Sequence, residues 1–215
     1  MIYTSSYDEQ KRTIYKTYSI SGDRGKLADY KGECYSKLAP KKSFWQVWHD
    51  NIGKISEEEN NKYYIEEYYK EVLSKLDPES VYDELLGSTL LCYEKNDEFC
   101  HRHIVAAWFE LLLGVHVPEI NYIREEVSRP EYIKDYLEET IKNNINMKGF
   151  TSLRARYLFH KSELLEEKAN KLEKENPDYC YDGYRQSACF LRCSADMEED
   201  EYRKSINTKR RLMKK

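Results

Sequence analysis

Three consecutive residues that can do chemistry, Cys100, His101 and Arg102, stand in the segment LLCYEKNDEFCHRHIVAAW, residues 90–108. A thiolate is a nucleophile, an imidazole transfers protons near neutral pH, and a guanidinium binds two oxygens of a carboxylate or phosphate. Glu94, earlier in the segment, adds a carboxylate. These side chains predict a site for covalent or acid–base chemistry on an anionic ligand.

The position of the four residues favours the same interpretation. A short apolar run precedes them and a helical pattern follows, and in an open α/β sheet the ligand crevice lies beyond the carboxyl ends of the strands. The free N–H groups of a helix start stabilise an anion and lower the pKa of a thiol there. We therefore predict Cys100 as nucleophile or ligand contact and His101 as a proton-transfer group. Glu94 is predicted as an orienting carboxylate or base, and Arg102 as the anion clamp.

The same residues have a purely structural alternative. Thiols are among the most buried side chains, so Cys100 can be inert. Arg102 can pair with Glu94 or Glu98, and His103 can cap the helix or pack against its neighbours. The residues by themselves leave both interpretations open.

Two further segments supply ligand-binding candidates for the same crevice. Ser5 lies in the opening segment IYTSSY (2–7), and Asp23 and Arg24 lie in SGDRGKLADYKG (21–32), after a predicted strand. The second segment has neither the Gly-x-Gly-x-x-Gly nor the Walker spacing, so it does not indicate nucleotide binding of those types. Its alternative is a mobile surface loop.

Association with nucleic acid is an alternative function. Trp45 and Trp48, flanked by lysines, could stack on a base, although such pairs more often belong to a core. The end KSINTKRRLMKK (204–215) is basic. Residues 145–215 hold 16 basic and 12 acidic residues, which leaves 19 basic and 27 acidic in residues 1–144. The acidic first part disfavours broad affinity for phosphate backbones. A protein-interaction module that docks through its helical tail is a third possibility.

No metal site is predicted, and the cofactor is unknown. Cys100 and His103 share a helical face, but no Cys-x-x-Cys pair or His-Glu-x-x-His accompanies them. The start of the sequence lacks the order of a signal peptide, so we expect the six cysteines to be reduced and mostly structural. Without the roughly 18 to 20 apolar residues that span a bilayer, we expect a cytoplasmic protein with no membrane partner. The oligomeric state is open.

Alternating strand and helix patterns predict an α/β fold with a mostly parallel sheet flanked by helices. The predicted strands are 2–7, 16–22, 88–94 and 115–120. The predicted helices of this part are 56–76 and 98–114. Ser56 and Glu59 form a capping box at the first helix, and Gly114 ends the second. We assign residues 1–122 to this domain.

The remaining residues, 123–215, predict an all-helical C-terminal extension. Its predicted helices are 131–144, 150–176 and 184–206. The second carries an apolar stripe that includes Leu153, Tyr157 and Leu164, and it therefore needs a partner, for which the third helix is nearest. Cys189 and Cys193 on the third helix are predicted to be packing residues.

The segment 90–108, together with KLAPKKSFWQVWHDN (37–51) and YYIEEYYKEVLSKLDPESV (63–81), resembles the family named domain of unknown function 488 (DUF488), over about residues 1–120. Members resemble one another in an opening strand of the IYTSSY kind and in a Leu-Leu-Cys-x-Glu strand end followed by a Cys-His-Arg helix start. The resemblance implies functional roles for the following residues: Glu94, Cys100, His101 and Arg102.

The resemblance supplies no reaction, and whether the protein is catalytic is open. Together, the motif and the resemblance predict an enzyme or a small-ligand binder. Its ligand would be anionic, with nucleotide-derived molecules as one class, and it would bind at the Cys-His-Arg helix start.

Overall fold

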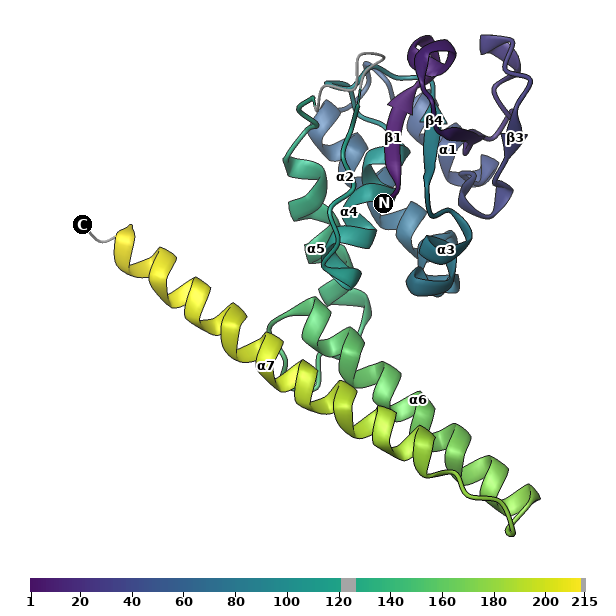
Figure 1. Ribbon diagram of the computed structural model, residues 1–215. Helices are drawn as coiled ribbons and strands as arrows, with labels where there is room; N and C mark the ends of the chain where they lie inside the picture. The colour runs from purple at the N-terminus through teal and green to yellow at the C-terminus, as the bar shows by residue number, and fades with distance from the viewer. Residues whose placement is uncertain (121–126, 214–215) are drawn as a thin grey trace. The chain divides into compact units, whose positions relative to one another are not determined.

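The computed structural model describes residues 1–120 and 127–213 (Figure 1). The chain divides into two compact units, Met1–Asn144 and Ile145–Lys215, which are described separately. The domain boundary predicted between residues 122 and 123 lies outside the described residues. None of the described helices is long and apolar enough to cross a membrane.

The first unit is built on a parallel sheet of four strands in the order β1-β4-β2-β3. The strands are β1 (Tyr3–Ser6), β2 (Lys16–Ser19), β3 (Glu33–Cys34) and β4 (Ser88–Cys92). All five residues of β4 are buried, as the apolar run predicts for a central strand. The α/β fold with a parallel sheet is confirmed, and three of the predicted strands match β1, β2 and β4.

The fourth predicted strand, residues 115–120, forms only an isolated bridge between Glu119 and Thr4 of β1. Pro118 has no N–H to donate, so a ladder cannot continue through it. Its carbonyl still accepts from the Thr4 N–H at 3.0 Å, and Ile120 donates to the Thr4 carbonyl at 3.0 Å. The segment therefore lies along the edge of β1, and this brings Glu119 into the interior.

The described residues of the first unit also form five α-helices: α1 (Lys42–Asp50), α2 (Glu57–Glu71), α3 (Pro78–Glu84), α4 (His101–Leu113) and α5 (Tyr132–Asn144). The hydroxyl of Ser56 accepts from the Glu59 N–H at 3.2 Å and caps α2, as predicted. Gly114 ends α4 with a positive φ of 66°, a conformation that favours glycine.

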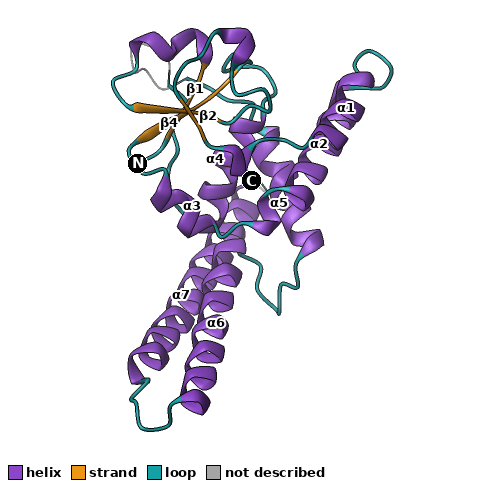
Figure 2. Cartoon of the chain, turned by 90° about the vertical axis from the view of Figure 1, so that its right-hand side faces the viewer, coloured by secondary structure: helices purple, strands orange, loops and turns teal. Residues whose placement is uncertain are grey.

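Helix α4 is the centre of this unit. Most of its residues are buried, including Trp108 and Phe109, and it packs against β1, β4, α2, α3 and α5. A helix surrounded in this way must be apolar on almost every face. Figure 2 shows α4 beneath the strands of the sheet. The first turn of α4 is therefore buried, and its polar side chains must be matched inside the protein.

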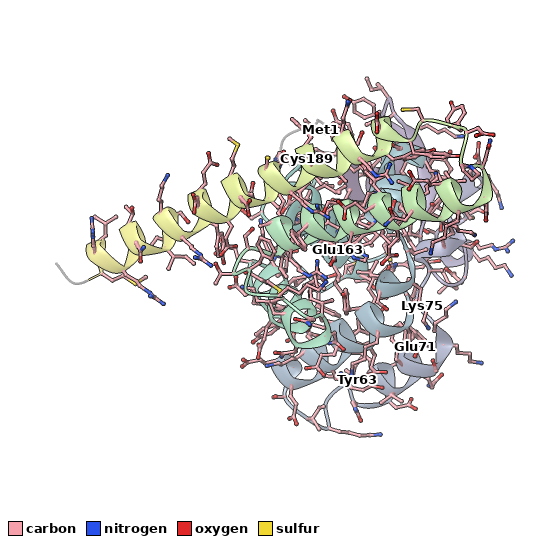
Figure 3. The ribbon with its side chains drawn as sticks, turned by 90° about the horizontal axis from the view of Figure 1, so that it is seen from below. Met1, Tyr63, Glu71, Lys75, Glu163 and Cys189 are labelled. Carbon is pink, nitrogen blue, oxygen red and sulfur yellow. The ribbon has the colours of Figure 1, made fainter. Side chains whose placement is uncertain are left out.

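The second unit is a hairpin of two helices, α6 (Leu153–Glu175) and α7 (Asp182–Leu212), which pack against each other. This confirms the predicted pairing, but the predicted stripe is partly wrong because Leu164 is 46% exposed. Leu153 is buried as predicted, and the fully buried residues of the two helices have small side chains: Ala155, Ser162, Ala169, Ala188 and Ala195. Cys189, on α7 in Figure 3, and Cys193 are exposed, so their predicted packing role is wrong.

Candidate active site

A cavity of about 480 Å³ opens beyond the carboxyl ends of β2 and β4. Its walls come from the segments that follow these two strands, from α1 and α2, and from the first turn of α4. This is where an open parallel sheet is expected to hold a ligand. Four predicted site residues line it: Asp23, Glu94, Cys100 and His101.

Cys100 is the N-cap residue of α4, with extended backbone angles and a side chain that makes no capping hydrogen bond. Only 2% of the residue is exposed. Burial raises the pKa of Cys100, but a hydrogen bond from the Cys92 thiol and the positive charge of Arg102 lower it more. The net pKa lies well below that of an ordinary thiol, which makes Cys100 a thiolate candidate.

Cys92, the last residue of β4, is the partner thiol. Its pKa is raised well above the ordinary value, first by burial and then by its hydrogen bond with Cys100 and the negative charge there. One proton shared by two close sulfurs explains the opposite shifts. The pair is expected to exist as a Cys92 thiol that donates to a Cys100 thiolate.

His101 is held by the backbone. Its Nε2 lies 3.0 Å from the carbonyl oxygen of Ile20, so Nε2 carries the proton and donates. The other ring nitrogen, Nδ1, lies 3.6 Å from the Cys92 sulfur. Burial lowers the pKa of His101, but interaction with the Cys100 thiolate outweighs it, and the net pKa is raised.

Glu94 follows β4 by two residues. Burial and the negative charge of Cys100 raise its pKa to about 7. Its Oε2 atom is buried and has no hydrogen-bond partner among the described residues. A carboxyl group that titrates near neutral pH and has an unpaired oxygen at a cavity is suited to general acid–base catalysis.

Arg102 does not line this cavity. It is fully buried, and its Nε and Nη2 lie 3.1 and 2.9 Å from Oε1 of Glu119. Sequence reasoning named Glu94 or Glu98 as structural partners, but the partner is Glu119 at the edge of β1. His103 Nε2 lies 3.4 Å from Glu119 Oε2. The predicted anion clamp is thus an internal ion pair, and Arg102 acts on the site through its charge on Cys100.

Two of the other ligand-binding candidates are also outside the cavity. Ser5 is buried in β1 and donates its hydroxyl to the Ile120 carbonyl at 2.6 Å. Arg24 is not among the lining residues and has a positive φ of 63°. Asp23 does line the cavity, and its carboxylate accepts hydrogen bonds from the Tyr93 hydroxyl and from the Gly25 N–H at 3.0 Å.

Trp45 and Trp48, predicted either to stack on a base or to belong to the core, line the same cavity as Cys100. Trp48 donates its indole N–H to Asn61 at 3.1 Å and packs against Phe99. Trp45 is 38% exposed and stacks on His49. The two hypotheses drawn from separate segments therefore concern one site, whose wall is aromatic.

Cys92 is the site residue that sequence reasoning missed. The sequence predicts the cysteines to be mostly structural, although Cys92 ends a buried strand, which is the signal that indicates Glu94. The sulfurs of Cys92 and Cys100 and a ring nitrogen of His101 lie within 4.8 Å of one another, a donor set that could hold a metal ion such as zinc. Cys100 and His103, which share a helical face, do not form such a set, since His103 lies beside Glu119.

The first unit thus combines a parallel sheet with a cysteine, a histidine and a carboxylate in the crevice beyond the carboxyl ends of its strands. The chain belongs to the DUF488 family: the family model DUF488-N3a, described as the active DUF488-N3 subclade, matches residues 2–112. This confirms the resemblance drawn from the motifs. No curated protein matches the chain, and no solved structure matches it.

Proposed function

We propose that the protein is an enzyme that acts on a small molecule through a covalent bond to Cys100. The observation that carries the proposal is the position of a thiol with a lowered pKa in the wall of an aromatic cavity, beside Glu94 and His101. Such a thiol is a nucleophile at neutral pH, whereas an inert buried thiol has a raised pKa.

The reaction class we infer is substitution at an electrophilic carbon. The Cys100 sulfur attacks, a carbon–sulfur bond forms, and the bond to the leaving group breaks. Protonated Glu94 gives its proton to the leaving group, and the resulting carboxylate then takes a proton from the water or acceptor that releases the product. A carboxyl group with a pKa of about 7 can do both. The charge of Arg102 and the Cys92 hydrogen bond favour the thiolate.

The substrate class follows from the lining. Trp45, Trp48 and Phe99 offer flat apolar surfaces on which a planar ring can stack. Among the described lining residues, Lys42 is the one Lys or Arg side chain, and it is exposed. We therefore propose a ligand with a planar ring and an anionic group, of which nucleotide-derived molecules are one class. The anion would meet Lys42 and not Arg102.

A small ligand is favoured over a nucleic acid because Trp45 and Trp48 both line this cavity. Trp48 is half-buried and its N–H is occupied by Asn61, so it does not form an open stacking platform.

The pH dependence of alkylation tests the proposal. The full chain is labelled with iodoacetamide between pH 6 and pH 9 and mapped by mass spectrometry, with the exposed Cys34 as internal control. Because Cys100 is buried, the readout is how its rate changes with pH and not the rate itself. Labelling of an ordinary exposed thiol falls as pH drops below about 8.5, whereas we expect Cys100 labelling to persist. Parallel loss at both residues would reject the thiolate.

A further inference from the structure

We propose that Cys92 is a resolving thiol, so that peroxide converts the site to a Cys92–Cys100 disulfide. The inference rests on the proposed role of Cys100 as the nucleophile and adds a redox reaction to the same cavity. It is carried by the arrangement of two sulfurs and an imidazole in one cavity wall.

The two sulfurs belong to elements that hold them close. Cys92 ends β4 and Cys100 caps α4, and only the segment between these elements separates them. Their sulfur atoms lie within 4.8 Å of each other. A disulfide needs a sulfur–sulfur distance of about 2.05 Å, so side-chain rotation and a small backbone adjustment must close the gap. Neither sulfur has to leave the cavity wall.

The oxidation balances with a peroxide as the oxidant. The Cys100 thiolate attacks one oxygen of hydrogen peroxide, the O–O bond breaks, and the departing hydroxide takes a proton from solvent to become water. Cys100 is left as a sulfenic acid. The peroxide is reduced by two electrons, and the sulfur is oxidised by two.

The second step uses Cys92. Its sulfur attacks the Cys100 sulfur, the S–S bond forms, the S–O bond breaks, and hydroxide leaves. The proton lost by Cys92 ends on that hydroxide as a second water. His101 Nδ1, 3.6 Å from the Cys92 sulfur and held by the Ile20 carbonyl on its far side, is in place to relay this proton. Without a second thiol to form a disulfide, the sulfenic acid of Cys100 would be oxidised further to a sulfinic acid.

Cys92 and Cys100 are buried but both line the cavity, which is the route by which a small oxidant would reach their sulfurs. The other four cysteines are Cys34, Cys180, Cys189 and Cys193, and all are exposed. They serve as a reference for general thiol oxidation, because exposed thiols react with peroxide without help from the cavity.

The test treats the full chain with a small excess of hydrogen peroxide after chelation, with metal content measured beforehand. Non-reducing peptide mapping should find the Cys92 and Cys100 peptides joined, two hydrogen atoms lighter, and released by dithiothreitol. In Cys92→Ala, Cys100 should instead react with dimedone and proceed to sulfinic acid. Cys189→Ala should behave as the parent does.

Two results would overturn the inference. One is over-oxidation of Cys100 in the parent chain without a link to Cys92. The other is a tightly held metal ion that keeps both thiols unoxidised. If Cys100 still alkylates at low pH in either case, the proposed function stands and only the resolving role fails. Loss of the low-pH alkylation itself is the separate result that rejects the proposed function.

Discussion

Cys100 and Arg102 are two residues apart at the start of α4, yet their side chains belong to two different buried clusters. One cluster is an internal ion pair, and the other lines a cavity. Arg102 meets Glu119 through a bidentate ion pair sealed from solvent. Cys100 meets Cys92 and His101 in a cavity wall. Each residue along a helix is rotated by about 100°, so neighbours in sequence face different surroundings. The matched pair of opposite charges, Arg102 and Glu119, stabilises the fold. The cluster at Cys100 lies beside a cavity and includes a carboxyl oxygen without a partner among the described residues, so it is available for chemistry.

The largest expected effect is on the matched pair. Arg102→Met leaves the Glu119 carboxylate buried without its main partner, which costs about 3–5 kcal/mol of unfolding free energy. Urea unfolding followed by tryptophan fluorescence measures it, because all three tryptophans lie in the first unit. The double variant Arg102→Met, Glu119→Leu removes both charges and should recover most of the loss. A loss below about 1 kcal/mol in the single variant would contradict the structural role.

Glu94 should give the next largest effect, and it should depend on pH. Its pKa is about 7 in the folded chain against an ordinary 4.5. A raised acid pKa adds stability that is fully present below the unfolded value and lost as pH rises through about 7. Relative to Glu94→Gln, the parent should therefore lose up to about 3 kcal/mol between pH 4 and pH 8. Urea unfolding at the two pH values is the measurement.

Glu98→Gln is the matched control for Glu94→Gln, since Glu98 is exposed in the same segment. It should track the parent at both pH values. If Glu94→Gln tracked the parent as well, folding would leave the pKa of the carboxyl at its ordinary value, and Glu94 would be ionised at neutral pH and would not serve as an acid there.

A substitution in the aromatic wall of the cavity should have a smaller effect, and this effect is on ligand binding. Stacking of a base on an aromatic ring contributes about 1–3 kcal/mol, so Trp45→Ala should weaken binding of adenosine monophosphate by roughly tenfold or more. Protection of Cys100 from alkylation reports the binding. Val47→Ala, an exposed residue of the same helix outside the cavity lining, is the control. Equal protection by ribose 5-phosphate would show that the ring plays no part.

The sequence predicts the fold where local signals are strong. The apolar run at 88–92 predicts a buried strand, because both faces of a central strand are covered by other elements. Ser56 is predictable as the cap of α2, because its hydrogen bond to the Glu59 N–H lies within the first turn of the helix. Strand β3 escaped prediction because it is two residues long and both are exposed. The edge segment at Glu119 could be predicted as extended, but Pro118 limits it to one bridge.

The sequence predicts where the candidate site lies, but it does not predict which side chains interact with one another there. The rule for strand carboxyl ends indicates Glu94 and Cys100 without any tertiary information. The partner of Arg102 lies 17 residues away and is set by the pairing of residues 118–120 with β1, which no local pattern encodes. The presence of Trp45 in the same cavity likewise depends on how α1 packs against α2.

The smallest expected effect is that of substituting Lys42, which we propose as the anion contact in place of Arg102. Lys42 is exposed at the cavity, and an exposed ion pair contributes only about 0.2–1 kcal/mol and weakens with salt. Lys42→Gln should therefore reduce the advantage of adenosine monophosphate over adenosine by less than about tenfold, and only at low salt. Calorimetry at two salt concentrations measures this.

Lys41→Gln is the matched control, because Lys41 is the exposed neighbour that does not line the cavity. Equal losses in the two variants would mean that the anion responds to general charge around α1 and not to a contact. Equal binding of adenosine and its monophosphate by the parent chain would remove the anion from the proposed ligand. The aromatic cavity and the Cys100 thiolate would remain, because neither depends on Lys42, and the buried Arg102 would still have no direct part in recognition.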